Sequence, residues 1–338
     1  KKVFADFWEN KARSFLIIAS ISIGIFAVGV VGVGYFVIPE SMEATYLSTN
    51  PANIQIQTDP FDEDLIKSIQ KIKGVKDVAG RTTITAKVKN PKTSDWLSFS
   101  IIAVEDLSDQ RIKVLELRSG KLIPGKNELL ISEDSLETLP VSPGSSIIVE
   151  LPDGTQRNFA VAGTVIDYSS DLAITFNQRT GFINLESLDY LYLPRQYNSL
   201  LVTVSGDAND LANIEAVASL VNKEIKNTGR RILSQSVARS IDQPFANYTD
   251  ALSVIISFIG LFILILSSSL IVNTMNALMA QHVRQIGVIK LIGGLRNQVI
   301  GMYLALVFFF SLISFLIAIP ASAYVGRMLA ANTLPALN

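Results

Sequence analysis

Three long stretches of the chain contain no charged residue and are dominated by apolar side chains. They cover residues 15–39, 251–280 and 297–326. Each stretch exceeds the roughly 20 apolar residues that a helix needs to cross the hydrocarbon core of a bilayer. The pattern therefore predicts three transmembrane helices. We expect residues 327–338 to form an outer loop that leads toward a fourth span.

The polar segment between the second and third spans is short and basic. Residues 281–296 contain His282, Arg284, Lys290 and Arg296 and no acid. The bias of cytoplasmic loops toward basic residues places this segment in the cytoplasm. Its apolar positions recur at helical spacing, which predicts a short amphipathic helix that lies at the inner membrane surface and ends at the Gly293-Gly294 pair. A plain helical-hairpin connection is the alternative.

The N-terminal segment is also basic. Residues 1–14 alternate charged residues with Phe4, Phe7 and Trp8, which stand at helical spacing. This pattern is typical of an amphipathic helix at a membrane interface, with the tryptophan at the level of the headgroups. A disordered basic tail is the alternative. The basic residues place the N-terminus in the cytoplasm, so the chain beyond the first span emerges outside.

The middle of the chain, residues 40–233, is polar and rich in strand patterns. Its opening predicts a strand, a helix and two further strands, and its end predicts one more strand and helix. Their ranges are 53–58, 62–73, 81–89, 96–104, 200–205 and 210–228. Between them, about residues 105–195 form a β-rich insert punctuated by glycine and proline. Residues 234–250 are expected to form a stalk that returns to the membrane, with a helix over 234–242.

One hairpin inside the insert has a strong turn signal. Alternating segments at residues 146–151 and 157–166 flank the sequence Pro152-Asp153-Gly154. An Asp-Gly pair between two alternating segments favours a tight β-turn. We therefore expect an antiparallel hairpin here.

Small residues recur along the first span. Gly24, Gly29 and Gly32 stand among apolar residues. Inside a membrane helix, glycines let a second helix approach closely. We read them as helix-packing positions that also serve to pair two copies of the chain, rather than as part of a nucleotide-binding fingerprint.

Composition excludes several kinds of site. The 338 residues are 49% hydrophobic, with a formal net charge of -1, no cysteine and a single histidine, His282. One histidine excludes a histidine-based triad or a His-rich metal site elsewhere. No basic stripe with interleaved aromatic residues suggests nucleic acid. We therefore expect no catalytic residues, no cofactor and no metal, and we expect the chain not to be an enzyme.

One stretch comes close to a nucleotide-binding loop. Residues 120–127 read GKLIPGKN, but Asn127 lacks the hydroxyl that would hold magnesium. The residues that follow predict a strand, whereas a phosphate cradle needs the N-terminus of a helix. We read this stretch as a turn before a strand.

The basic cytoplasmic segment resembles a known family. Residues 284–293, RQIGVIKLIG, are similar to the R-x-E-I-G-V-x-[KR]-A-[IL]-G segment of FtsX-like permeases, the MacB/FtsX/LolC superfamily of ABC transporters. Gln285 stands where the family usually has Glu, and Leu291 stands where it usually has Ala. Residues 10–14, NKARS, resemble the family's entry to its first span and supply a second, separate match.

The resemblance implies a role for this segment. In the family it is the coupling helix, which docks on a separate ATPase subunit. The positions that the resemblance assigns to this contact are Arg284, Gln285, Ile286, Gly287, Val288, Lys290, Leu291 and Gly293. Because Gln285 replaces the usual Glu, a salt bridge from that position to the ATPase is not expected here.

The resemblance also implies a fold and a function. The fold is an α+β membrane protein: transmembrane helices plus a large extracytoplasmic α/β domain, porter-like, with a small β insert. The function is that of a permease subunit, a multi-pass protein of the cell membrane. Its implied partners are an ABC ATPase, membrane lipids and a second permease copy or homologous permease. It would convert ATP hydrolysis into movement of the outer domain (mechanotransmission), for export or release of a lipidic, peptide or drug-like cargo. The alternatives are an FtsX-type regulator of cell-wall hydrolases and a membrane receptor with a ligand-binding ectodomain.

Overall fold

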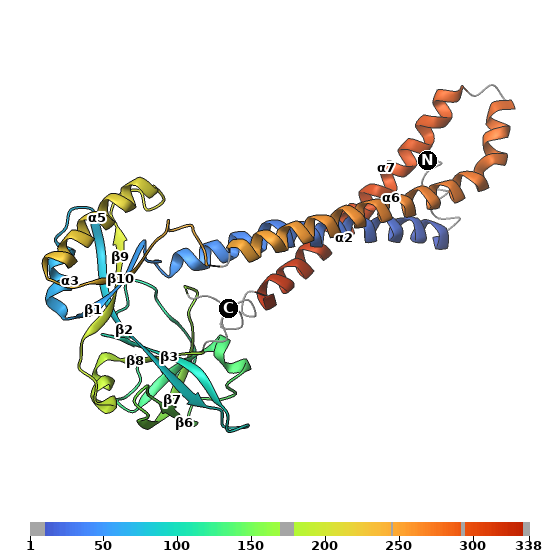
Figure 1. Cartoon of the computed structure of the whole chain (residues 1–338). Helices are drawn as coiled ribbons and strands as arrows, with labels where there is room; N and C mark the ends of the chain where they lie inside the picture. Colours follow the sequence, from blue (N-terminus) through green and yellow to red (C-terminus); the bar gives the residue numbers. More distant parts are fainter. Residues whose placement is uncertain (1–10, 170–178, 245, 292–294, 334–338) are drawn as a thin grey trace. The chain divides into compact units, whose positions relative to one another are not determined.

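The computed structural model of the chain describes residues 11–169, 179–244, 246–291 and 295–333 (Figure 1). The chain forms two units. One is an α/β domain built on Met42–Ala246, and the other is helical and is built on the segments before and after it. An amphipathic helix is expected over residues 1–14, and residues 1–10 lie outside the described part of the chain.

The helical unit contains the three apolar helices that the sequence predicts. They are α2 (Lys11–Ser48), α6 (Ala246–Leu291) and α7 (Arg296–Thr333). The parts long and apolar enough to cross a membrane are Ser14–Ser48, Ser253–Asn273 and Leu304–Met328.

Helix α2 runs further than the span predicted to end at Pro39. It continues through this proline to Ser48. A proline inside a helix removes one backbone hydrogen bond. The residues that follow, ESMEATYL, include Glu, Met and Ala, which favour a helix and allow it to resume.

The α/β domain is built on one ten-stranded sheet. Its hydrogen-bonded order is β10-β1-β9-β2-β3-β8-β5-β7-β4, and β6 pairs with β2 and β7. The strands are β1 (Ile54–Phe61), β2 (Val75–Lys89), β3 (Trp96–Val104), β4 (Glu116–Gly120), β5 (Glu128–Ser132), β6 (Ser146–Glu150), β7 (Gln156–Ile166), β8 (Arg179–Asn184), β9 (Tyr197–Val204) and β10 (Ile232–Val237). The helices are α3 (Glu63–Gln70) and α5 (Leu211–Asn227), with short 3₁₀ helices η1 (Glu133–Glu137) and η2 (Leu185–Leu191).

The opening strand-helix-strand-strand order confirms the sequence prediction. Strands β2 and β3 pair without a break from Arg81 opposite Val104 to Lys89 opposite Trp96. Helices α3 and α5 carry apolar faces that pack on β1 and β9, and this forms the first core of the domain (Figure 1). Ile54, Ile69 and Val221 are fully buried in it.

The β insert closes into a barrel that the sequence did not reveal. Strands β2, β3, β8, β5, β7 and β6 pair in a ring, because β6 bonds to β7 on one side and to the far end of β2 on the other. Phe99 of β3 and Phe159 of β7 are fully buried in its core. The second core therefore uses β2 and β3, which precede the expected start of the insert near residue 105.

The predicted hairpin is present between β6 and β7. Ser146 lies opposite Ala160 and Glu150 lies opposite Gln156. The turn requires Gly154, whose φ of +85° lies in the left-handed region that favours glycine.

The helix predicted over residues 234–242 is wrong. Residues 232–237 form β10, which pairs antiparallel with β1 from Ile54 opposite Val237. Without this strand, the outer edge of β1 would leave its backbone N–H and C=O groups unpaired. Long-range pairing therefore overrides the local helical pattern.

Candidate functional site

The segment by which the chain enters the α/β domain and the segment by which it leaves are joined by one buried hydrogen-bond network, which we call the root network. At its centre is Asn53, just before β1, with 1% of its surface exposed. Its Nδ2 donates to the carbonyl oxygens of Ala208 (3.2 Å) and Ala238 (3.3 Å) and to Ser240 Oγ (2.9 Å). Its Oδ1 accepts from the backbone N–H of Val204 (3.1 Å). One side chain thus joins the segment after α2, the segment before α6 and the loop between β9 and α5.

A second contact joins the same two segments. The Tyr46 hydroxyl, in the last turns of α2, donates to the carbonyl oxygen of Asp242 at 3.2 Å. Asp242 is held in turn by Arg239, whose Nη2 lies 2.8 Å from its Oδ1. The side-chain hydrogen bond from Arg239 lowers the pKa of Asp242, so this carboxylate stays ionised.

The strand that follows the root network is also tied to the start of β10. Asp59 near the end of β1 accepts from the backbone N–H (2.9 Å) and the guanidinium of Arg231. These hydrogen bonds lower the pKa of Asp59. The incoming and outgoing strands are therefore connected at both ends of β10.

The end of α2 is also held by a loop, residues 105–115, which we call the strap. The backbone N–H groups of Lys113 and Val114 donate to the carbonyl oxygens of Asn50 (3.1 Å) and Thr49 (3.0 Å). The strap is held from the other side by Arg81 of β2, whose Nη2 donates to the carbonyl oxygens of Ile112 and Lys113. The strap therefore connects the end of α2 to β2 through hydrogen bonds on both sides.

The predicted coupling segment lies at the opposite end of α6 from the root network. We expected a separate short helix here, but α6 continues unbroken through residue 291. The reason lies in the sequence: the stretch ALMAQHVRQ contains no glycine or proline, and most of its residues favour a helix. Helix α6 is described as far as Leu291, and α7 begins at Arg296.

Three residues of the coupling segment lie along one face of the helix. Val283, Gly287 and Leu291 follow one another at four-residue spacing, so they share a face. Val283 is 62% exposed and Leu291 is 87% exposed, and a Cβ added at Gly287 would meet no described atom within 4 Å. For the other predicted contact residues the structure describes only the helical backbone (Arg284, Gln285, Ile286, Val288 and Lys290), and Gly293 lies outside the described residues.

The three glycines of the first span have different surroundings. A Cβ added to Gly24 would meet Ser267 of α6 at 3.0 Å, and one added to Gly29 would meet Ser322 Oγ of α7 at 2.4 Å. A Cβ at Gly32 would have no described atom within 4 Å. Gly24 and Gly29 thus serve packing within one chain, whereas Gly32 has no close neighbour among the described residues.

Apolar and polar contacts combine where α2 packs on α7. Ile17, Ile21, Leu306 and Phe310 form a buried cluster. Beside it, the buried Ser314 hydroxyl donates to the carbonyl oxygen of Ile18 at 3.0 Å. Interhelical bonds of this kind are typical of membrane helices.

The stretch resembling a nucleotide-binding loop has a different use. Lys121 pairs with Glu128 at 2.6 Å, and the same carboxylate accepts from the backbone N–H of Gly125. A strand, β5, follows. Lys121 therefore stabilises a turn through its ion pair with Glu128.

Sequence reasoning missed the two side chains that organise the domain around α2. The local pattern marks Asn53 only as the first residue of a strand and Arg81 only as the start of another. A weak signal existed for Asn53, because asparagine is depleted in strands and favoured where it can bond to nearby backbone. No local signal marks Arg81, since its partners lie about thirty residues away in the sequence.

Two family models match the chain in adjacent regions. The MacB-like periplasmic core domain matches residues 14–224, and the C-terminal domain of FtsX-like permeases matches residues 257–337. The first alone covers more than half of the chain. The chain belongs to the FtsX/MacB family of permeases. Members are transmembrane permeases of ABC transporters, generally non-catalytic, and work with ABC ATPase partners.

Solved structures similar to this permease cover its α/β domain. The periplasmic region of MacB from Actinobacillus actinomycetemcomitans is 15% identical, with a TM-score of 0.37, and the match covers 56% of this chain and 91% of that one. The extracellular domain of the transporter YknZ from Gram-positive bacteria is 16% identical, with a TM-score of 0.35, covering 53% and 100%. A domain of a permease protein from Porphyromonas gingivalis is 12% identical, with a TM-score of 0.33, covering 56% and 90%. No curated protein sequence matches the chain.

The family assignment sets what kind of protein this is. The chain is an ABC-type permease of the FtsX/MacB kind, a membrane protein with an extracytoplasmic domain of mixed α/β fold. The α/β domain contains the root network, and α6 carries the predicted coupling segment.

Proposed function

We propose that the chain is the permease subunit of a bacterial ABC transporter that works by mechanotransmission. ATP hydrolysis in a separate ATPase subunit would change the conformation of the extracytoplasmic domain, and that change would export or release a lipidic, peptide or drug-like cargo. The observation that carries the proposal is the continuity of α6 from Ala246 to Leu291. Its 46 residues, at a rise of 1.5 Å each, make a rod of about 69 Å, more than twice the thickness of a hydrocarbon core.

The end of α6 near Leu291 would receive the motion. The open face of Val283, Gly287 and Leu291 offers apolar contact on either side of a bare backbone. Gly287 would let the ATPase approach closely, Ile286 would be the apolar anchor, and Arg284 and Lys290 would form a basic flank. The remaining contact positions would be Gln285, Val288, Leu291 and Gly293.

The other end of α6 would deliver the motion to the α/β domain. The residues just before α6 are bonded to Asn53 and to Tyr46 of α2. A shift of α6 relative to α2 would therefore strain the hydrogen bonds of the root network directly. In this mechanism the α/β domain responds to the relative position of its two connecting helices.

The proposal includes an orientation and a partner copy. The N-terminus and residues 281–296 would face the cytoplasm, the α/β domain would lie outside, and two permease chains would pair through α2 and α6. Cysteines placed singly at Asp153 and Arg284 of this cysteine-free chain should react from opposite sides of the membrane. Labelling of both from the same side would contradict the orientation.

A break in α6 tests the central mechanism. Asn276 is exposed and stands between the apolar span and the coupling segment. Asn276→Pro removes a backbone hydrogen bond and kinks the helix, whereas Asn276→Ala leaves it straight. A reporter cysteine at exposed Leu233 of β10 should change its reactivity on ATP addition in the alanine variant and lose that response in the proline variant, with the ATPase still bound. An equal ATP response in both variants would contradict transmission along α6.

A further inference from the structure

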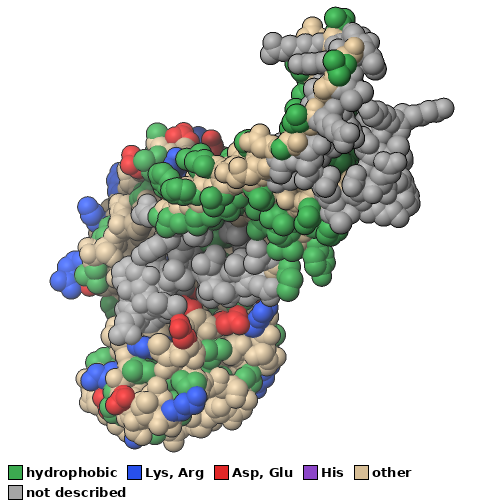
Figure 2. All heavy atoms as spheres, turned by 90° about the vertical axis from the view of Figure 1, so that its right-hand side faces the viewer, with side chains coloured by type: hydrophobic (Ala, Val, Ile, Leu, Met, Phe, Trp, Pro, Cys, Tyr) green, Lys and Arg blue, Asp and Glu red, His purple; other side chains and the backbone are tan. Residues whose placement is uncertain are grey.

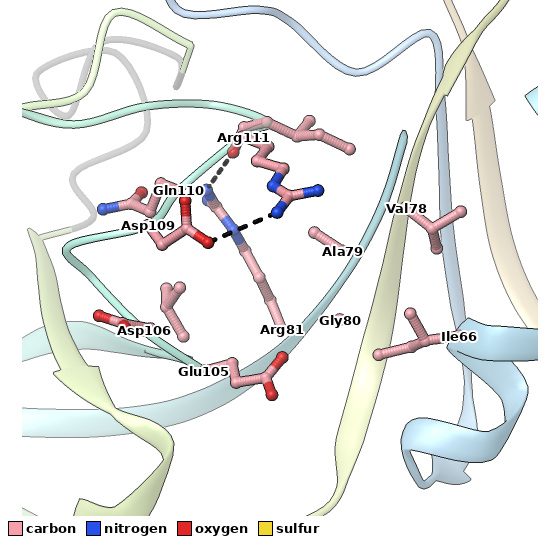
Figure 3. Close-up of a pocket in the computed structure, with 12 residues that line it drawn as sticks. Ile66, Val78, Ala79, Gly80, Arg81, Glu105, Asp106, Asp109, Gln110 and Arg111 are labelled. Carbon is pink, nitrogen blue, oxygen red and sulfur yellow. Dashed lines mark hydrogen bonds and ion pairs between the residues drawn. The ribbon is translucent and has the colours of Figure 1, made fainter. Parts of the chain in front are cut away.

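A cavity of about 350 Å³ lies in the α/β domain between β2 and the strap. Figure 3 shows Arg81 rising from β2 into this region, with Ala79 and Gly80 of the same strand to one side and the strap residues Glu105 and Asp109 to the other. The volume falls within the usual range of small-molecule sites, about 300–1,000 Å³.

The guanidinium of Arg81 is buried and largely unpaired. Only 5% of the residue is exposed. Nη2 donates to the carbonyl oxygens of Ile112 (3.0 Å) and Lys113 (2.9 Å), while Nε is buried without a partner among the described residues. Nη1 also makes no hydrogen bond in the described part of the chain. Three of the five N–H donors of this side chain are thus not used by the described residues.

No carboxylate of the described chain forms an ion pair with this arginine. Among the described residues, Asp167 is the one acid that acts on Arg81 electrostatically; burial outweighs its effect and lowers the pKa of Arg81. A buried charge without a close counter-charge costs several kcal/mol. Two backbone carbonyl groups offset only part of this, so the arrangement favours an anionic group at the floor of the cavity.

The rim of the cavity carries the opposite charge. Glu105, Asp106 and Asp109 line it, and all three are exposed. Asp106 accepts from the Ser108 N–H and hydroxyl, which lower its pKa, and Asp109 lies 3.6 Å from Arg111. Three carboxylates against one exposed arginine leave the mouth acidic. A purely anionic ligand would be repelled there, whereas a ligand with a cationic group would be attracted.

The wall between floor and rim is held in place. The strap is fixed to β2 by Arg81 and to Thr49 and Asn50 by backbone hydrogen bonds. Ile66 of α3 and Val78 of β2 add apolar surface on the other side (Figure 3). The cavity is therefore preformed, with a cationic floor and an acidic mouth.

We propose that this cavity binds a small zwitterion, a free amino acid or a short peptide with unblocked ends, whose carboxylate pairs with Arg81 while its ammonium group faces Glu105, Asp106 and Asp109. The carboxylate would accept from Nη1, and from Nε after a small adjustment, in charge-assisted hydrogen bonds. The ammonium group would remain near the mouth.

Binding to the full chain in lipid nanodiscs tests this directly, without the ATPase. The probes are alanine, trialanine, trialanine amide, which lacks the carboxylate, and N-acetyl-trialanine, which lacks the ammonium group. Calorimetry should show saturable binding of alanine or trialanine and at least a tenfold weaker affinity for each blocked form. No binding of either zwitterion at millimolar concentration, or equal affinity for all the trialanine forms, would overturn the proposal.

Variants assign the binding to this cavity. Glu105→Gln with Asp109→Asn changes only exposed side chains and should weaken zwitterion binding at least fivefold, while Glu137→Gln, an exposed acid on η1, should leave it unchanged. Arg81→Gln should abolish binding; because Arg81 also holds the strap, its thermal unfolding is measured alongside. Binding that persists unchanged in the two rim substitutions, or in a folded Arg81→Gln chain, would overturn the assignment.

Discussion

The two ends of α6 differ in how much of their bonding lies within the chain. The residues before Ala246 are held by the root network, by Tyr46 and by the Arg239–Asp242 pair. The predicted coupling segment at the other end presents Val283, Gly287 and Leu291 with no described packing partner. One end is held by hydrogen bonds within its own polypeptide, whereas at the other end the described side chains Val283 and Leu291 are exposed. Figure 2 shows exposed apolar side chains on the helices.

This difference is what a mechanical connection requires. A helix passes motion on only if one end is firmly attached and the other is gripped by the part that moves. The root network supplies the attachment within the chain. In the proposed mechanism, the ATPase subunit would hold the exposed face around Gly287.

The largest effect is expected from removing the centre of the root network. Asn53→Ala deletes four side-chain hydrogen bonds and leaves the buried Val204 N–H and two carbonyl groups without this partner. We expect the α/β domain to lose about 2–4 kcal/mol of unfolding free energy. Chemical unfolding of the full chain in nanodiscs measures this. Asn158→Ala, an exposed position on β7, is the matched control and should change stability by less than about 0.5 kcal/mol.

A destabilisation by Asn53→Ala no larger than that of the control would mean that the root is held elsewhere. The attachment would then have to be sought in the Asp59–Arg231 contact or in the strap.

A smaller effect is expected from substitutions at the glycines of α2. These substitutions distinguish packing within one chain from pairing of two chains. Gly29→Leu places side-chain atoms against Ser322, so it should destabilise the helical unit by about 1–3 kcal/mol. A side chain at Gly32 would meet no described atom within 4 Å, so Gly32→Leu should leave the folded monomer intact. It should lower the fraction of paired chains, because the close backbone contact between copies is lost. Thermal unfolding and the dimer fraction in nanodiscs, measured for both variants, decide this. An unchanged dimer fraction for Gly32→Leu would remove Gly32 from the pairing surface.

The smallest effect concerns acid pH. Hydrogen bonds from Arg231 and Arg239 lower the pKa values of Asp59 and Asp242 below the ordinary 3.8. A carboxylate with a depressed folded pKa contributes stability above its unfolded pKa, and this contribution disappears as the pH falls through the folded value. The melting temperature of the domain should therefore fall as the pH decreases below about 4. It should fall less steeply in the Asp59→Asn, Asp242→Asn double variant than in the wild type. Both pairs are exposed, so the effect is modest. Identical slopes for the two proteins would contradict it.

Much of the fold could be predicted because its signals are local. The apolar spans, the alternation of β1 and β3, and the Asp-Gly turn between β6 and β7 depend on residues close together in the sequence. Two features could not be predicted. Strand β10 exists because β1 offers it an unpaired edge, and the barrel closes because β6 reaches the far end of β2. Both depend on partners more than fifty residues away.

The candidate site divides in the same way. Gly287 and its neighbours could be predicted as a coupling segment because the motif is contiguous. Asn53 and Arg81 bond to segments distant in the sequence, so their partners could not be predicted from the residues around them.

The ATPase activity of the complex, with Gly287→Trp compared with wild type, tests the central claim most directly. A bulky ring cannot enter a cleft that fits a bare backbone, so the variant should lose permease-dependent stimulation of the ATPase while its insertion and α/β domain stay intact. Gly301→Trp is the matched control, since a Cβ at this helical glycine also meets no described atom within 4 Å, and it should retain stimulation. Ile286→Asp should also abolish stimulation by burying an unpaired charge, and Gln285→Glu, which restores the residue usual in the family, should preserve or strengthen it. Full stimulation by an intact complex that carries Gly287→Trp would contradict the coupling role of this segment.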